Sequence, residues 1–142
     1  MKQDGRWQKT RYIVSDDPAF VYFVIPKVAC SSIKTTLLPT FGMEEPPDRA
    51  YGVHALFNGT PHQIDKAALL DGGAYRDHFS FAFVRNPWDR LVSCWSQKFA
   101  PGRRGEGVGR RYREGRLRVG MGFEEFAENV CKIPDESANP HF

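Results

Sequence analysis

Apolar residues are almost continuous from Phe20 to Ile25, and Pro26 ends this run. A short, unbroken run of β-branched and aromatic residues is typical of a strand that is buried on both faces of a parallel sheet. Beyond it, apolar residues recur at helical spacing between Ser32 and Leu38, and this spacing predicts a helix that stops at Pro39. The pattern therefore predicts a strand, a tight loop and a helix.

The same pattern recurs later in the chain. The run Phe79–Val84 again fits a buried strand, and after Arg85 the pair Asn86 and Pro87 suits the cap and the first position of a second helix. Two such units with a helical crossover between them predict an α/β fold with a central parallel sheet. Ligands bind these sheets beyond the carboxyl ends of the strands, where both Lys27 and Arg85 fall.

The remaining segments have weaker patterns. Residues Arg11–Val14 fit a short strand or an arm on the sheet edge, and Thr40–Gly59 reads as a long surface loop. A helix is predicted from Thr60 to the Gly72-Gly73 pair, and another over Phe123–Val130. The stretch Pro101–Gly122 is rich in glycine and arginine, so we expect it not to contribute to the core.

Composition narrows the class of protein. The 142 residues fit a single domain over 1–142, and a net charge of +3 is too small by itself to indicate nucleic acid. Three widely spaced cysteines indicate neither a disulfide framework nor a metal site, and reduced thiols favour a cytoplasmic location. The N-terminal residues lack the apolar core of a signal peptide, and no segment approaches the roughly 20 apolar residues of a membrane span. We expect no membrane association.

The loop after the first strand should bind an anion. A helix start presents unpaired N–H groups and the positive end of the helix dipole, and Lys27 adds a full charge. Ser31 or Ser32 could cap the helix. The loop lacks the glycines of GxxxxGK[ST], which disfavours a magnesium-dependent NTPase, and it lacks the arginine that a cysteine-based phosphatase would need after Cys30.

Two motifs resemble those of a known family. PKVACSSIK, at residues 26–34, resembles the 5′-phosphosulfate loop of sulfotransferases that use 3′-phosphoadenosine 5′-phosphosulfate, in particular the carbohydrate sulfotransferase branch. FVRNPWDRLVS, at residues 83–93, is similar to the family's second motif, whose arginine and serine bind the 3′-phosphate; Arg85 and Ser93 match them. The loop positions that the resemblance assigns to the donor are Lys27, Ala29, Cys30, Ser31 and Ser32.

The resemblance carries expectations about fold and activity. It implies a P-loop-NTPase-like three-layer fold and transfer of a sulfuryl group from 3′-phosphoadenosine 5′-phosphosulfate to a hydroxyl, most often on a carbohydrate, without a metal. Lys27 would neutralise charge on the departing phosphate. The likeness runs from about Arg11 to the end, but family members continue beyond Phe142 with a segment that closes over the adenosine. The chain is therefore expected to lack the C-terminal part of the family domain.

An acceptor hydroxyl must lose its proton, so a general base is expected. The candidates are His54, His62, His78 and His141. In related carbohydrate sulfotransferases the base lies between the two donor motifs, roughly twenty residues before the second, and His62 fits that position. His54 lies in the predicted loop and could touch substrate, whereas His78 could equally be a packed residue.

Other interpretations stay open. Lys27 could be solvated beside a turn, and Arg85 could form a structural salt bridge with Asp89. The chain could be a small-molecule kinase of related architecture. It could also be a nonenzymatic domain that binds an anionic glycan through the arginine run Arg103–Arg118; nucleic acid is the less favoured ligand there, because the run contains one aromatic residue, Tyr112.

Overall fold

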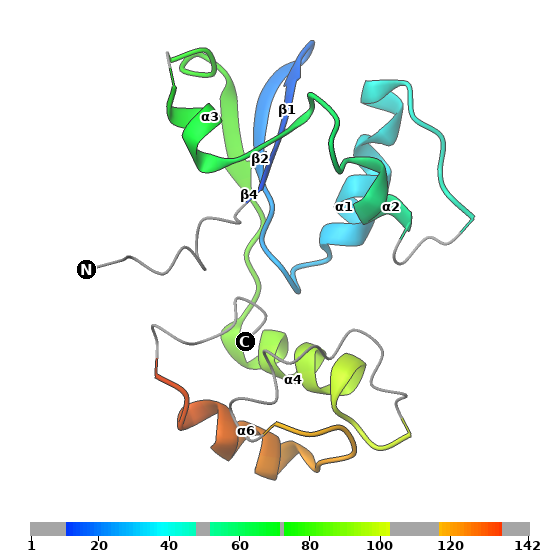
Figure 1. Ribbon diagram of the computed structural model, residues 1–142, viewed down its shortest axis with the longest axis vertical. Helices are drawn as coiled ribbons and strands as arrows, with labels where there is room; N and C mark the ends of the chain where they lie inside the picture. Colours follow the sequence, from blue (N-terminus) through cyan, green and yellow to red (C-terminus); the bar gives the residue numbers. More distant parts are fainter. Residues whose placement is uncertain (1–10, 48–51, 72, 103–116, 135–142) are drawn as a thin grey trace. The chain divides into compact units, whose positions relative to one another are not determined.

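The structure, a computed structural model, describes residues 11–47, 52–71, 73–102 and 117–134 (Figure 1). The chain divides into two compact units, one of Met1–Ile25 and Ala29–Val84, the other of Pro26–Val28 and Arg85–Phe142. The predicted donor loop spans this division, because Lys27 belongs to the second unit and Ala29 to the first. Within the described ranges, no helix is both long and apolar enough to cross a membrane.

The first unit is built on a four-stranded sheet with the strand order β3-β1-β2-β4. Its strands are β1 (Tyr12–Asp16), β2 (Ala19–Phe23), β3 (Gln63–Ile64) and β4 (Phe79–Ala82). β2 and β4 run parallel, as the two repeated patterns predict, but β1 runs antiparallel to both β2 and β3. The prediction of a parallel sheet is therefore wrong for the sheet as a whole, which is mixed.

The connection between β1 and β2 explains this difference. Only Asp17 and Pro18 separate the two strands, and a two-residue turn joins antiparallel strands, whereas parallel strands need a crossover of a dozen or more residues. β1 also lies between β2 and β3. The first strand is therefore an inner strand, and not the edge arm that its sequence suggested.

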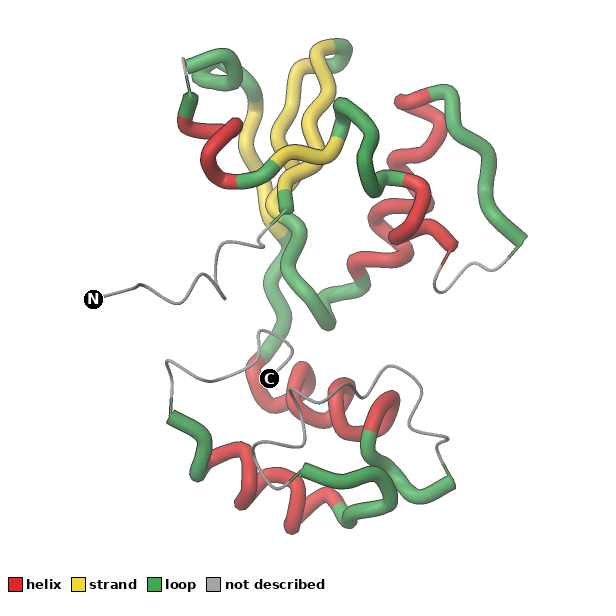
Figure 2. Tube along the Cα trace, in the orientation of Figure 1, coloured by secondary structure: helices red, strands yellow, loops and turns green. Residues whose placement is uncertain are grey.

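Residues of β1 and β2 alternate between two packed faces of the sheet, whose strands are drawn in yellow and whose neighbouring helices are drawn in red in Figure 2. On one face the buried residues are Ile13, Phe20 and Tyr22, with Leu38, Val53 and Phe57 from the helical segments beside them. On the other face they are Tyr12, Val14 and Val21, near Leu69 of the helix α3 (Lys66–Leu70). Strand β2 is thus buried on both faces, as predicted.

Helix α1 (Cys30–Leu37) follows the first loop, and a 3-10 turn, η2 (Leu38–Phe41), begins where it ends. The predicted stop at Pro39 is confirmed to within two residues. Helix α2 (Gly52–Leu56) lies inside the stretch that was predicted to be a surface loop, and that prediction is wrong because Val53, within the helix, is fully buried. A helix of five residues is too short to reveal its period in the sequence.

The helix predicted from Thr60 is replaced by two shorter elements. β3 pairs with β1 first, and α3 begins only after Asp65, whose Oδ1 accepts a hydrogen bond of 2.9 Å from the Ala68 N–H. Ile64, which lies within the predicted helix, belongs to the strand. The aspartate cap therefore fixes the start of this helix at Lys66, six residues later than predicted.

Strand β4 is more exposed than its sequence suggests. Phe79 is 71% exposed, and Val84, beyond the strand, is 85% exposed. Among the described residues β4 is the end strand of the sheet, with β2 as its neighbour. The prediction that Phe79–Val84 is buried is therefore wrong. Apolar composition shows that a strand is suited to burial, but it does not show whether other elements cover that strand.

The second unit contains α4 (Pro87–Lys98) and α6 (Phe123–Cys131). The predicted cap of α4 is confirmed, since Asn86 Oδ1 accepts a hydrogen bond of 2.9 Å from the Trp88 N–H. The core of this unit consists of Cys94, Phe99, Leu117, Met121 and Phe126. Leu117 and Met121 come from the glycine- and arginine-rich stretch, so the expectation that the whole stretch stays out of the core is wrong. Its residues 103–116 lie outside the described part of the chain.

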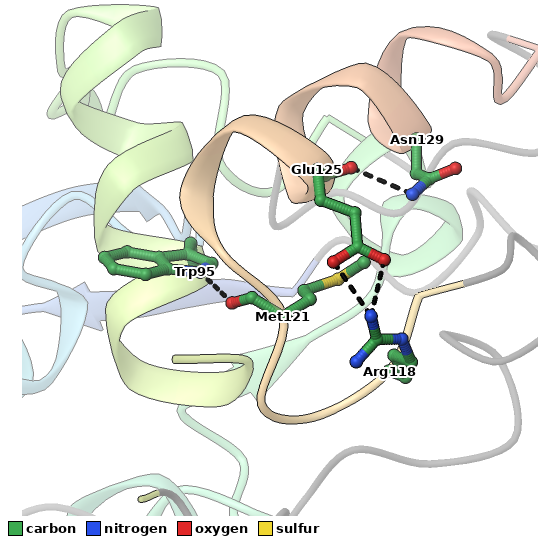
Figure 3. A network of polar contacts seen from close by, with 5 residues as sticks. All are labelled: Trp95, Arg118, Met121, Glu125 and Asn129. Carbon is green, nitrogen blue, oxygen red and sulfur yellow. Dashed lines mark hydrogen bonds and ion pairs between the residues drawn. The ribbon is translucent and has the colours of Figure 1, made fainter. Parts of the chain in front are cut away.

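A polar network ties the segment before α6 to α4 and α6 (Figure 3). Trp95 Nε1 on α4 donates a hydrogen bond of 2.9 Å to the Met121 carbonyl. Arg118 donates to both carboxylate oxygens of Glu125 at 2.8 and 2.9 Å, and Asn129 donates to the Glu125 carbonyl at 2.8 Å. The network fixes the register between α4 and the start of α6.

Candidate functional site

The start of α1 carries the hydroxyls and N–H groups that the sequence assigns to an anion. Ala29 precedes the helix in the left-handed conformation, with φ 66° and ψ 29°, which is uncommon for a residue with a Cβ. No side chain caps this helix start, so the expectation that Ser31 or Ser32 caps it is wrong. Both serines instead lie in the first turn, next to the half-buried Cys30. Backbone strain before an uncapped helix start supports a binding role for this loop.

A histidine from α2 reaches this first turn. His54 Nε2 lies 2.9 Å from Ser31 Oγ, a hydrogen-bond distance, and both side chains are half-buried. The sequence had placed His54 in a loop and gave no reason to associate it with Ser31. The structure brings together a candidate base and a predicted donor-binding residue.

A positive charge that acts on His54 comes from Lys34, which follows Ser31 by about one turn of α1. Lys34 is only 3% exposed, and its Nζ lies 5.5 Å from the centre of the Phe57 ring. Burial lowers the pKa of Lys34, with the Arg11 charge adding to the effect and a negative charge on Cys30 opposing it. Burial, and then the Lys34 charge, lower the pKa of His54. His54 is therefore uncharged at neutral pH.

Tyr22 places a polar atom in the core of the same unit. The residue is fully buried, and its hydroxyl has no hydrogen-bond partner among the described residues. Burial, and then a negative charge on Cys30, raise the pKa of Tyr22 to about 12. The phenol thus stays protonated, as a donor without an acceptor.

Lys27 lies in the second unit, in the left-handed conformation with φ 66°. Its Nζ donates a hydrogen bond to Oε1 of Gln97 on α4. Gln97 follows Ser93 by four residues, so the two side chains project from the same face of that helix. The structure therefore associates Lys27 with the helix face that carries Ser93, the predicted 3′-phosphate ligand.

Arg85 directly precedes the Asn86 cap of α4 and is exposed. The described residues contain no ion pair between Arg85 and Asp89, so the salt bridge considered as an alternative role for Arg85 is not formed. The Arg85 guanidinium therefore lies at a capped helix start and forms no ion pair with a carboxylate among the described residues. Its N–H donors suit the binding of a phosphate.

The other described histidines have different surroundings. The ring of His62 lies 4.5 Å from the Phe41 ring, and its backbone carbonyl accepts a hydrogen bond from the Val14 N–H at 2.9 Å. His78 Nε2 lies 3.2 Å from Asp16 Oδ1, which supports a structural role for that residue. His62 thus remains the base predicted from the sequence, with no contact that tests it, and His141 lies outside the described residues.

The two motifs leave the sheet at the same edge. In the parallel pair of β2 and β4, Phe23 is the register partner of Ala82, and both strands end there. Lys27 follows Phe23 by four residues, and Arg85 follows Ala82 by three. This is the arrangement that an α/β sheet uses to bind ligands beyond its strand ends.

Three contacts of this region were not predicted. Gln97 as the partner of Lys27 and His54 as the partner of Ser31 depend on long-range packing, for which the sequence gives no signal. For Lys34 the sequence did contain a signal, since a lysine on the apolar side of a short helix is unusual. Among the described residues, no three His, Cys, Asp or Glu side chains are grouped closely enough to hold a metal ion.

Comparison with known proteins gives the family. The sequence model described as "Sulfotransferase family" matches residues 10–142. Carbohydrate sulfotransferase 14 of Mus musculus is 32% identical over 92% of this chain, and that of Homo sapiens is 31% identical over the same share. Carbohydrate sulfotransferase 10 of Rattus norvegicus is 28% identical over 82% of the chain. No solved structure matches.

The match covers only part of each relative. The chain spans 37% of the length of carbohydrate sulfotransferase 14 and 36% of that of carbohydrate sulfotransferase 10. Both donor motifs nevertheless fall inside the region that the family model covers. The chain therefore belongs to the sulfotransferase family.

Proposed function

We propose that the chain acts as a carbohydrate sulfotransferase that uses 3′-phosphoadenosine 5′-phosphosulfate as its donor, within a P-loop-like three-layer fold. The observation that carries the proposal is the parallel pairing of β2 with β4. Because the two strands end together, both motif loops begin at the same end of the sheet. The carbohydrate acceptor is suggested by the names of relatives about 30% identical to the chain.

The donor phosphates are assigned to different residues. The first turn of α1, with Ala29 and Cys30 through their backbones and Ser31 and Ser32 through their hydroxyls, receives the 5′-phosphosulfate. Arg85 and Ser93 receive the 3′-phosphate, because a guanidinium offers bidentate hydrogen bonds to a phosphate monoester. This second contact would distinguish the donor from ATP, which lacks a 3′-phosphate.

The transfer step needs a cation and a base. Lys27 neutralises the charge that grows on the 5′-phosphate oxygen as the bond between that oxygen and sulfur breaks. His62, the base that we propose, takes the proton of the acceptor hydroxyl as its oxygen forms the new bond to sulfur. The products are a sulfate ester and adenosine 3′,5′-bisphosphate, so atoms and charges balance without a metal ion in the proposed step.

Calorimetric titration with adenosine 3′,5′-bisphosphate and with AMP tests the donor. We expect the bisphosphate to bind more tightly, and Arg85→Ala to weaken its binding by about 1.5–3 kcal/mol, the scale of a lost charged hydrogen bond, while AMP affinity barely changes. Ser93→Ala should act in the same direction but more weakly.

Arg76→Ala is the matched control for this titration, because Arg76 is also exposed but lies outside both motifs. It should leave both affinities unchanged. Equal binding of AMP and the bisphosphate by the wild-type chain would contradict the proposed donor. A requirement for Mg²⁺ would favour a kinase instead.

Measurements of turnover and of donor affinity distinguish the proposed base, His62, from the proposed cation, Lys27. Lys27→Ala should reduce both donor affinity and turnover, whereas His62→Ala should cut turnover by roughly 10²–10⁴ and spare donor affinity. The hydrogen bond between His54 and Ser31 makes His54 the competing base. Full activity in His62→Ala, with loss of the limb near neutrality of the pH–rate profile in His54→Ala, would transfer the assignment to His54.

A further inference from the structure

The Ser31 hydroxyl has one proton, which it can donate either to the His54 ring or to a bound anion. Its oxygen lies 2.9 Å from His54 Nε2, so one of the two groups donates to the other. If Ser31 donates to the ring, it has no proton left for an anion. If the ring donates from Nε2–H, the Ser31 oxygen is the acceptor and its own proton is available to a phosphate oxygen.

We propose that His54 is a positioning residue that holds the Ser31 hydroxyl as a donor directed at the 5′-phosphate group of the nucleotide. The inference rests on the proposed function, since it takes the start of α1 as the site of that phosphate. It assigns to His54 a role in donor binding that is distinct from proton abstraction at the acceptor.

The backbone that carries His54 is anchored in the core on both sides of this residue. Val53 and Phe57, which flank His54 on and after α2, are both fully buried in the cluster that also contains Leu38 after α1. Anchors on either side of a short helix restrict the imidazole before any ligand arrives. Such preorganisation reduces the entropy lost on binding.

The surroundings of the ring also leave it free to adopt the required tautomer. His54 is uncharged at neutral pH because of its burial and the nearby charge of Lys34. A neutral imidazole carries one proton, on either ring nitrogen. A phosphate that accepts from Ser31 favours the tautomer with the proton on Nε2, so anion binding and the His54–Ser31 hydrogen bond support one another.

The test compares two ligands that differ only in the 5′-phosphate. The 142-residue chain is titrated with adenosine 3′,5′-bisphosphate and with adenosine 3′-monophosphate. We expect His54→Ala to weaken bisphosphate binding about 3- to 10-fold, the scale of a neutral hydrogen bond, and to leave the monophosphate unaffected. His54→Gln, whose side-chain amide can donate to Ser31, should recover most of the loss.

A double-mutant cycle with Ser31→Ala shows whether the two residues act together. The double variant should bind the bisphosphate no more weakly than Ser31→Ala alone. Losses that multiply, or an unchanged affinity in His54→Ala, would overturn the inference. Thr36→Ala is the matched control, because it removes a hydroxyl from the same helix, one that donates to the Ser32 carbonyl at 3.1 Å.

The outcomes for the two proposals differ. A wild-type chain that binds the two ligands equally tightly refutes a 5′-phosphate site at α1 and therefore the proposed function itself. A preference for the bisphosphate that is undiminished in His54→Ala refutes only the positioning role. If His54→Ala does not fold, nitrogen chemical shifts of the His54 ring in the wild type decide: a protonated Nε2 in the bisphosphate complex is expected, and an unprotonated Nε2 overturns the inference.

Discussion

Replacing Trp95 by phenylalanine should destabilise the second unit by about 1–3 kcal/mol, the cost of leaving a buried acceptor without a partner. Trp95 Nε1 donates to the carbonyl of Met121, a residue with no exposed surface, so water cannot readily replace the lost donor. The Trp95 ring also meets the Phe123 ring edge-on at 5.5 Å, and phenylalanine retains part of that contact. The lost hydrogen bond, and not the aromatic contact, should dominate the cost.

The comparison with Arg118 makes this reasoning testable. Arg118 and Glu125 form an ion pair with two hydrogen bonds, but the two side chains are 65% and 43% exposed. Solvent screens such a pair, and exposed ion pairs contribute about 0–1 kcal/mol. Arg118→Gln should therefore cost less than Trp95→Phe, although it removes more interactions.

Urea unfolding followed by far-ultraviolet circular dichroism, at low and high salt, measures both variants. The cost of Arg118→Gln should shrink in 1 M salt, where charges are screened beyond roughly 3 Å, while that of Trp95→Phe should persist. Hydrogen exchange in α4 supplies a second probe, so that each free energy is assigned to the correct unit. An Arg118→Gln cost equal to or above that of Trp95→Phe would falsify the argument from burial.

Three further predictions concern buried titratable groups. Tyr22→Phe should leave the free energy of unfolding unchanged or raise it by up to about 1 kcal/mol, because it removes a buried hydroxyl that has no partner; a clear loss in urea unfolding would reveal a hidden acceptor. The pKa of His54 is lower in the folded chain than in the unfolded chain, so the unfolded chain binds the proton first and stability should fall as the pH drops below about 6.5; His54→Gln should show a smaller fall in the urea midpoint between pH 7 and pH 5, and an equal fall would contradict the assignment. Burial raises the pKa of the Cys94 thiol to about 11, so a thiol reagent should modify the exposed Cys131 in the folded chain and Cys94 only after unfolding, as mass spectrometry of the labelled peptides would show.

Local sequence signals succeeded where neighbouring residues decide the structure. The apolar run that forms β2 and the Asn86-Pro87 start of α4 are both as predicted, because strand burial and helix capping depend on a few adjacent residues. The two motif loops were located for the same reason. Family motifs are contiguous in the chain, so they could be recognised before the sheet was known.

Long-range packing decided what the sequence could not predict. α2 is only five residues long, so its contribution to the core comes from its neighbours and not from its own period. His54 acquires its partner Ser31 only through the packing of α2 on α1. Met121 likewise enters a core from a stretch whose composition resembles a solvated loop. In each case a residue's role depends on partners that are distant in the sequence.

The chain passes from one compact unit to the other three times, after Ile25, after Val28 and after Val84. No single cut can therefore separate the units as complete fragments. A break at Val84 would give a C-terminal peptide that contains Gln97 but lacks its partner Lys27. Expressed separately, the two peptides should regain that hydrogen bond only by reassembling, so this division supports a split-protein reporter in which recovery of the proposed nucleotide binding measures fragment association.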